Sequence, residues 1–455
     1  MSSHGGGESR GIPLLTPLLK WMSGEDIDYG VPVAIVGILV VLFLLTAAGV
    51  SQAKLISIIF LASPIWLPYF TFQLFFSKWM EMVGKKFAVK SGRTVYEIRL
   101  PQDVFKSPEA MEFVFTQISN KASPDNLMET YLDGKRPMYY SVELVSRGGD
   151  VHFYATILNK FKYAFIDNMY SQYPGVEVVE VDLDYTAEIP HSLKGVSMMS
   201  FIFNKKKAEE FPIKTYLDFG MDKLPKEEEK VDPMTPMLEM LAGIKPHQQV
   251  WIQILYRAHR DQNFKNGQLH ASGTWESRVE GKIDEIMKRG DFAEHRDEDG
   301  TVLDLGAARL TTFEKDKVDA MQRNASKEAF ECVIRVLYLS HKERDYDGGL
   351  YSRMIRTFAQ TELKGRNGIG MKWRTDFNYK FLSDPFGKIV PAMKQEEMHH
   401  YKARNWHGPT AIFTAEELAT LFHLPGKVAA TPTLNRVPST RGEAPSNLPI
   451  GTPQF

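Results

Sequence analysis

The sequence predicts an α+β protein with an N-terminal transmembrane helical hairpin, two tandem ferredoxin-like (split βαβ) subdomains and an extended C-terminal tail. Three observations predict this class: two long uncharged apolar runs, two successive β-α-β-β-α-β patterns and a proline-rich end. The 455 residues leave room for two or three domains. The predicted parts are an N-terminal tail (1–30), the hairpin (31–86), a first subdomain (87–205), a second subdomain (206–385) with a helical insertion (260–325), and a short helix with a proline-rich tail (386–455).

Two apolar runs near the N-terminus predict the transmembrane hairpin. The first extends from Val31 to Val50 without a charged residue, and a helix of that length is about 30 Å long, which matches the hydrocarbon core of a bilayer. The second extends from Leu55 to Phe76, also without charge, although two prolines interrupt it. Prolines are tolerated in membrane helices, so a kinked second span is predicted. A re-entrant or interfacial segment is the alternative.

Basic residues predict the orientation of this hairpin. The tight turn between the two runs carries one basic residue, Lys54, whereas several lysines follow the second run: Lys78, Lys85, Lys86 and Lys90. Because basic residues favour the cytoplasmic side of a membrane, both termini and the folded domains are predicted to be cytoplasmic. The chain is therefore expected to be a multi-pass protein of the inner membrane, with the lipid bilayer as a partner.

The first predicted subdomain begins with a strand at residues 94–100, where apolar and polar residues alternate. Ser107, Pro108 and Glu109 then supply a cap, a first-turn proline and an early acid, so a helix is predicted behind them. Residues 138–146 and 151–157 are predicted to form a hairpin around a Gly-Gly turn. A helix at residues 159–173 and a strand at 176–182 complete the pattern.

The second predicted subdomain repeats this order with an insertion. Strands are predicted at residues 213–219, 249–257, 327–339 and 371–382, and helices begin at Thr235 and Gly348. Two further helices, near residues 277–288 and 312–323, form the insertion in place of a tight turn.

The C-terminal part contains one more helix signal. Residues 414–417 have the spacing of a capping box, and Leu418, Leu421 and Phe422 then make the apolar side of a short helix through which the tail is expected to dock. Four prolines follow among Ser, Thr and Arg. This composition favours an extended segment, either a strap across a domain or a disordered tail.

Composition and motifs limit the chemistry that the sequence predicts. The net charge of −1 gives no overall attraction to nucleic acid, and one cysteine, Cys332, excludes a disulfide framework and a multi-cysteine zinc site. A G-x-x-x-x-G-K-[ST] phosphate loop is absent from the sequence. His399, His400 and His407 lie near two glutamates, but adjacent ligands commonly point apart, so a surface loop is favoured over a metal site. No catalytic, cofactor-binding or metal-binding residue is therefore predicted.

Aromatic residues on the predicted strands raise the question of RNA binding. Tyr139, Tyr140, Phe153 and Tyr154 lie on adjacent strands of a ferredoxin-like sheet, and RNA-binding domains of that topology stack bases on such residues. Their glycine-aromatic consensus is absent from this sequence. Packing in the core is the favoured interpretation.

An ordered series of segments runs through the chain: residues 96–100, 140–144 with Gly148 and Gly149, 173–177, 232–236, 249–254, 416–425 and 445–449. This series resembles the N-terminal region of bacterial membrane-anchored conjugation and type IV secretion ATPases, which are coupling-protein-like. In that family the tail leads into a RecA-like ATPase domain with a phosphate loop, whereas this sequence ends at Phe455. The resemblance therefore implies an anchor and a cytoplasmic assembly module without the motor.

The leading hypothesis is a non-enzymatic, membrane-anchored component of a type IV secretion or conjugative DNA-transfer-like machine. The resemblance implies docking of a separately encoded ATPase, contact with other secretion subunits and self-association, with no cofactor. The alternative is a membrane-associated platform that binds nucleic acid. A third hypothesis, a metal-dependent enzyme, would use the three histidines near residue 400.

Overall fold

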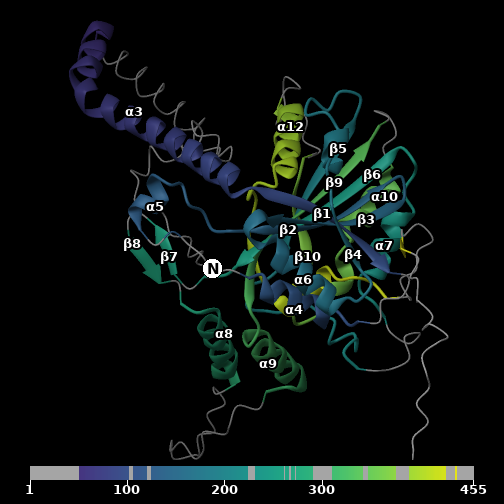
Figure 1. Ribbon diagram of the computed structural model, residues 1–455. Helices are drawn as coiled ribbons and strands as arrows, with labels where there is room; N and C mark the ends of the chain where they lie inside the picture. Colours follow the sequence, from purple (N-terminus) through teal and green to yellow (C-terminus); the bar gives the residue numbers. More distant parts are fainter. Residues whose placement is uncertain are drawn as a thin grey trace, which may run out of the picture. The chain divides into compact units, whose positions relative to one another are not determined.

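The computed structural model describes residues 51–101, 106–119, 124, 126–223, 231–260, 262–265, 268–271, 273–290, 310–341, 347–375, 389–426 and 436–437 (Figure 1). The chain divides into two compact units, residues 1–90 with 124–136, and residues 91–123 with 137–455. Each unit is described by itself.

The first unit contains α3 (Gln52–Ser91) and α5 (Leu127–Tyr131). The two helices are joined by aromatic and polar contacts: the indole N–H of Trp79 donates to the carbonyl of Tyr131 at 2.7 Å, and the Phe76 and Tyr131 rings lie 5.5 Å apart. Asn126 caps α5, because its side chain accepts the Glu129 N–H at 2.9 Å. The short helix is therefore fixed at both its start and its end.

The predicted second membrane span, from Leu55 to Phe76, lies inside α3. Among the residues that the structure describes, no helix combines the length and the apolar character needed to cross a membrane. The predicted hairpin and the multi-pass inner-membrane location were therefore wrong. The prediction rested on the absence of charge, but the run contains Ser57, Ser63, Thr71 and Gln73 and continues without a break into the lysine-rich end of α3. The predicted first span, residues 31–50, is outside the described residues.

A sheet of ten strands forms the centre of the second unit, in the order β10-β5-β9-β6-β2-β3-β1-β12, with β4 paired to β1 and β11 paired to β9 (Figure 1). All pairs are antiparallel except β1 with β12. The bounds are β1 Arg93–Pro101, β2 Tyr140–Arg147, β3 Asp150–Leu158, β4 Glu177–Glu180, β5 Ser197–Lys205, β6 Gln248–Ala258, β9 Ala329–Ser340, β10 Ile369–Arg374, β11 Ala411–Thr414 and β12 Arg436–Val437.

The sheet has two halves with the same strand order. The first half is β4-β1-β3-β2 and the second is β10-β5-β9-β6, which in both cases is the order of a split βαβ unit. β2 then pairs along its whole length with β6, from Tyr140 with Tyr256 to Arg147 with Gln249. The sequence had predicted two separate subdomains. In the structure, the two halves are instead parts of one continuous sheet.

The first strand of the second half is β5, and the strand predicted at residues 213–219 was wrong. Residues 213–219 contain a turn instead of a strand, and in this turn the Asp218 side chain accepts the N–H of Thr215 at 2.9 Å. By contrast, the predicted Gly-Gly turn is present between β2 and β3. Gly148 and Gly149 have φ values of 62° and 99°, a region that glycine adopts without steric cost.

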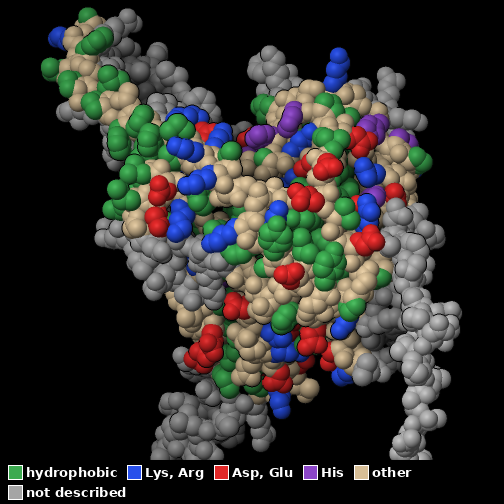
Figure 2. Space-filling view, viewed as in Figure 1, with side chains coloured by type: hydrophobic (Ala, Val, Ile, Leu, Met, Phe, Trp, Pro, Cys, Tyr) green, Lys and Arg blue, Asp and Glu red, His purple; other side chains and the backbone are tan. Residues whose placement is uncertain are grey.

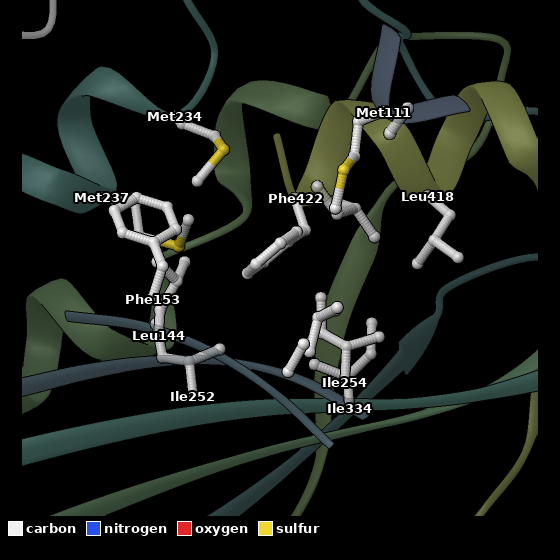
Figure 3. Close-up of a cluster of buried hydrophobic side chains, with 14 of the residues drawn as sticks. Met111, Leu144, Phe153, Met234, Met237, Ile252, Ile254, Ile334, Leu418 and Phe422 are labelled. Carbon is white, nitrogen blue, oxygen red and sulfur yellow. The ribbon is translucent and has the colours of Figure 1, made fainter. Parts of the chain in front are cut away.

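Five helices contribute to the core on one face of the sheet: α4 Glu109–Gln117, α6 Lys162–Gln172, α7 Thr235–Ala242, α10 Gly348–Ile355 and α13 Ala415–Leu421. Figure 3 shows part of this core, where Leu144, Phe153 and Ile252 of the sheet lie opposite Met237 of α7 and Phe422. Short 3-10 helices occur at η1 Asn159–Phe161, η2 Tyr185–Glu188 and η4 Ala359–Thr361.

The opposite face of the sheet packs against α12 (Ile389–Lys402), which the sequence did not predict. Met398 and Tyr401 of this helix pack with Trp251, Leu337 and Leu339. The predicted insertion contains a small hairpin, β7 Gln262–Lys265 with β8 Gln268–Ala271, and two helices, α8 Trp275–Gly290 and α9 Thr312–Ala325. The two helices form a separate hydrophobic cluster together with Ala329 of β9 and Ile412 of β11.

Candidate functional site

The segment of residues 389–424, here called the C-terminal segment, contacts both faces of the sheet. Its parts are α12, a turn at Arg404, β11 and α13. Arg404 has a φ of 50°, a left-handed conformation that is uncommon for a residue with a side chain. Such a backbone persists only when its surroundings determine it, and the contacts of the Arg404 side chain supply that constraint.

The guanidinium of Arg404 binds two carboxylates under α12. Its Nε and Nη2 donate to the two oxygens of Glu143 at 2.8 and 3.0 Å, and its Nη1 donates to Asp184. Glu143 is fully buried in the middle of β2. It also accepts hydrogen bonds from Ser141 at 2.7 Å, Gln253 at 2.9 Å and Tyr185 at 2.7 Å. Both carboxylate oxygens therefore have donors, as a buried charge requires.

The pKa of Glu143 reflects two opposing causes. Burial is the largest single cause and raises this pKa, but the charge of Arg404 and the hydrogen bonds from Arg404, Ser141 and Tyr185 together lower it by more, so it lies below its ordinary value. The pKa of Asp184 is lowered through the same balance. Both carboxylates therefore remain ionised at neutral pH and pair with Arg404. In the sequence, Asp184 is 220 residues from Arg404 and Glu143 is 261 residues from it.

α13 is held on the other face by a second set of buried charges. Glu417 accepts the Thr414 N–H as part of a capping box and forms an ion pair of 2.9 Å with Lys205 of β5. Its Oε1 accepts the N–H of Ile213 at 2.9 Å, whereas its Oε2 accepts the Thr414 N–H. Next to it, Glu416 accepts the Thr215 hydroxyl at 2.5 Å. The two glutamates therefore bind the segment to β5 and to the stretch that contains Ile213 and Thr215.

The end of α13 carries a third buried pair. The Nε2 of His423 lies 3.2 Å from a carboxylate oxygen of Asp232, and its Nδ1 lies 2.9 Å from the Ala419 carbonyl. Burial raises the pKa of Asp232. His423 and the N–H of Met234 together lower this pKa by more, so the net shift is downward. His423 is thus buried within the core.

The predicted docking residues Leu418, Leu421 and Phe422 are buried in the core of the chain itself. Phe422 meets the ring of Phe153 edge to face at 5.8 Å (Figure 3). These three side chains therefore attach the C-terminal segment to its own sheet.

The lysines predicted to set topology lie on α3. Lys78 and Lys85 form exposed ion pairs with Glu81 at 3.0 and 2.6 Å, and Lys86 and Lys90 are exposed. Hydrogen bonds from Lys85 and Lys78 lower the pKa of Glu81 to about 2. Of the other hairpin positions, Val31 and Val50 lie outside the described residues, and Leu55 and Phe76 lie on α3.

The three histidines are close together but do not form a ligand set. The His400 and His407 rings stack at 4.1 Å with an interplanar angle of 13°, and the His399 ring is 5.9 Å from His400. Burial lowers the pKa of His400 to about 4. Parallel rings direct their nitrogens along parallel lines instead of toward one point. Within the described part of the chain, no group of three potential ligands has a geometry that could hold a metal ion.

The aromatic residues considered for RNA binding have few free faces. Tyr140, Phe153 and Tyr154 are buried. Tyr139 lies under the Arg93 guanidinium at 3.8 Å and meets the Trp406 ring at 5.4 Å. These contacts support the favoured interpretation of the rings as packing residues.

Cys332 lies on β9 and is buried. Burial raises the pKa of this thiol well above its ordinary value, and the thiolate is the reactive form. We expect no measurable reaction of the native chain with a thiol reagent at pH 8, and full reaction of one thiol in denaturant. A fast native reaction would show that β9 is accessible.

A cleft lies on the same face of the sheet as α12, in the first half. It is lined by residues of β1, β3 and the stretch from β4 to η2, and its volume is about 600 Å³. His152 is the central polar side chain, with Nδ1 2.7 Å from Glu97 and Nε2 3.5 Å from Arg147. Its ring stacks on Tyr154 at 6.0 Å.

Sequence reasoning did not find this cleft or the Arg404 cluster. Glu97 and His152 are 55 residues apart, so no local spacing joins them. One signal was present in the sequence: Glu143 is a charged residue on a strand that is otherwise buried. No protein-family model matches the chain, and no curated protein matches it.

Proposed function

We propose that the chain is a non-catalytic assembly module of a type IV secretion or conjugative DNA-transfer-like machine, and that it docks a separately encoded ATPase. The proposal begins from the resemblance of the ordered segments to the N-terminal region of such ATPases. It assigns the chain a role in positioning other subunits, and other secretion subunits and further copies of the chain are the remaining proposed partners.

One observation supports this proposal most strongly: the resembling segments that the structure describes meet in one core. Leu144, Ile252, Met234 and Phe422 come from four of these segments and belong to the same hydrophobic cluster (Figure 3). Asp232 and His423, from two of them, form a buried pair. The series thus consists largely of residues that fix a shape. A fixed shape is what an assembly module presents to its partners.

Co-purification with a defined partner tests the proposal. The tagged full-length chain is crosslinked in its source cells and isolated, and the bound proteins are identified by mass spectrometry. We expect a protein with a phosphate loop and a RecA-like domain. Purified separately, this protein and the chain should form a complex of fixed stoichiometry by light scattering, whereas an unrelated RecA-like ATPase should not bind.

Two results would overturn the proposal. The first is ATP hydrolysis by the purified chain alone, because the proposed module is non-catalytic. The second is recovery of crosslinked partners that include no such ATPase. Saturable binding of DNA or RNA by the chain alone, weakening steeply as salt rises, would instead favour the nucleic-acid platform.

A further inference from the structure

Hydrogen-bonded polar side chains form the centre of the cleft in the first half of the sheet. The Glu97 carboxylate is occupied on both oxygens, by His152 Nδ1 at 2.7 Å and by Arg99 Nε at 3.0 Å. The His152 side chain is only 10% exposed. Because its Nδ1 faces a carboxylate, that nitrogen carries a proton, and Nε2 faces the side chains of Arg147 at 3.5 Å and Asp150 at 3.4 Å.

The two arginines of this cleft have donor groups left over. Beyond Nε, the nearest acidic partner of Arg99 is Glu177, at 4.0 Å, and Arg147 has Glu188 at 4.0 Å. Both distances exceed those of a hydrogen bond. Among the described residues, each guanidinium therefore keeps terminal N–H groups that no carboxylate accepts. Such forked donors match the oxygens of a carboxylate or a phosphate.

The cleft also has an apolar side. Leu183, which is 76% exposed, and Val181 both line the cleft. The rings of Tyr154 and Tyr185 stack at 4.8 Å beneath them. Sites for small ligands combine such apolar walls with a few convergent polar groups.

We propose that the cleft binds a ligand that carries an oxyanion, a carboxylate or a phosphate, on an apolar body. The oxyanion lies between the guanidiniums of Arg99 and Arg147, with His152 at the base, and the apolar body contacts Leu183. Glu177 and Glu188 flank the arginines and are both about half exposed. They compete for the same donors, so the affinity is moderate. This inference does not depend on the docking of an ATPase.

Two probes with the same apolar body test the proposal. The full-length chain is titrated with benzoate and with phenyl phosphate by calorimetry, and with acetate and inorganic phosphate as probes that lack the ring. We expect saturable binding of at least one aromatic probe and weaker binding of its ring-free counterpart. The aromatic probe that binds identifies the oxyanion as carboxylate or phosphate.

Variants of the two arginines locate the site. Arg99→Met and Arg147→Met should each weaken the binding by roughly tenfold, whereas Arg356→Met, which changes an exposed arginine of the same unit, should leave it unchanged. If a methionine variant unfolds at a lower temperature than wild type, Arg99→Lys and Arg147→Lys replace it. These variants keep the positive charge but lack the forked donors of a guanidinium, so they should still weaken binding.

Two outcomes would overturn the proposal. One is the absence of saturable binding by both aromatic probes up to about 10 mM. The other is binding that all four substitutions at Arg99 and Arg147 leave unchanged, because the probe would then occupy another place.

Discussion

Replacement of Glu143 by alanine is expected to lower the free energy of unfolding by roughly 3–5 kcal/mol, because the variant leaves the buried guanidinium of Arg404 without its main partner. The same change removes an acceptor from Ser141, Gln253 and Tyr185. The measurement is urea unfolding of the purified chain, followed by circular dichroism. A matched control is Glu180→Ala, which removes an exposed carboxylate from β4 of the same sheet and should change the free energy by about 0.5 kcal/mol or less.

The effect of Glu143→Ala should depend on pH in a defined direction. The folded-state pKa values of Glu143 and Asp184 are both lowered, so their contribution is complete above the unfolded pKa values, about 4. It is lost as the pH falls through the folded values. The difference between wild type and variant should therefore be constant above about pH 5 and shrink below about pH 4. A difference between wild type and Glu143→Ala that grows on acidification would contradict the ion pair. Equal losses of stability in Glu143→Ala and Glu180→Ala at pH 7 would also contradict it.

Replacement of Glu417 by alanine is expected to have the second large effect, again roughly 3–5 kcal/mol. The variant leaves Lys205 buried without its counter-ion and removes the capping box of α13. The chain offers a matched control in the neighbouring residue. Lys206 pairs with Glu362 at 2.6 Å, but these side chains are 43% and 46% exposed.

Glu362→Ala should therefore cost about 1 kcal/mol or less, since exposed ion pairs contribute little. Both variants are compared with wild type in the same denaturant titration. Comparable losses for the buried and the exposed pair would show that α13 is not held as the structure indicates.

Local patterns predicted most strands and helices on the sheet because they depend on neighbouring residues. Alternation located β1, the Gly-Gly turn located the hairpin of β2 and β3, and the proline after Ser107 preceded α4 as expected. The same reasoning missed β5, whose residues 197–205 are mostly buried on both faces and show no clear alternation. It also gave the uncharged run of α3 a membrane role that the described helix does not bear out.

The functional geometry was harder to predict, since it depends on pairs distant in sequence. The capping box at Thr414 was visible because its partners are three residues apart. That Glu417 is also buried against Lys205 was not visible, because 212 residues separate them. Arg404 and Glu143 are 261 residues apart. The local patterns of a single sequence give no means of pairing residues that are so far apart.

We expect the C-terminal segment to unfold in the same cooperative unit as the sheet. Native-state hydrogen exchange measures this directly, because it gives an opening free energy for each protected amide. We predict that the amides of α13 open with the same free energy as those of β6, within about 1 kcal/mol, and that Glu417→Ala lowers both together. Exchange of α13 at a much lower free energy, with β6 still protected, would contradict the account.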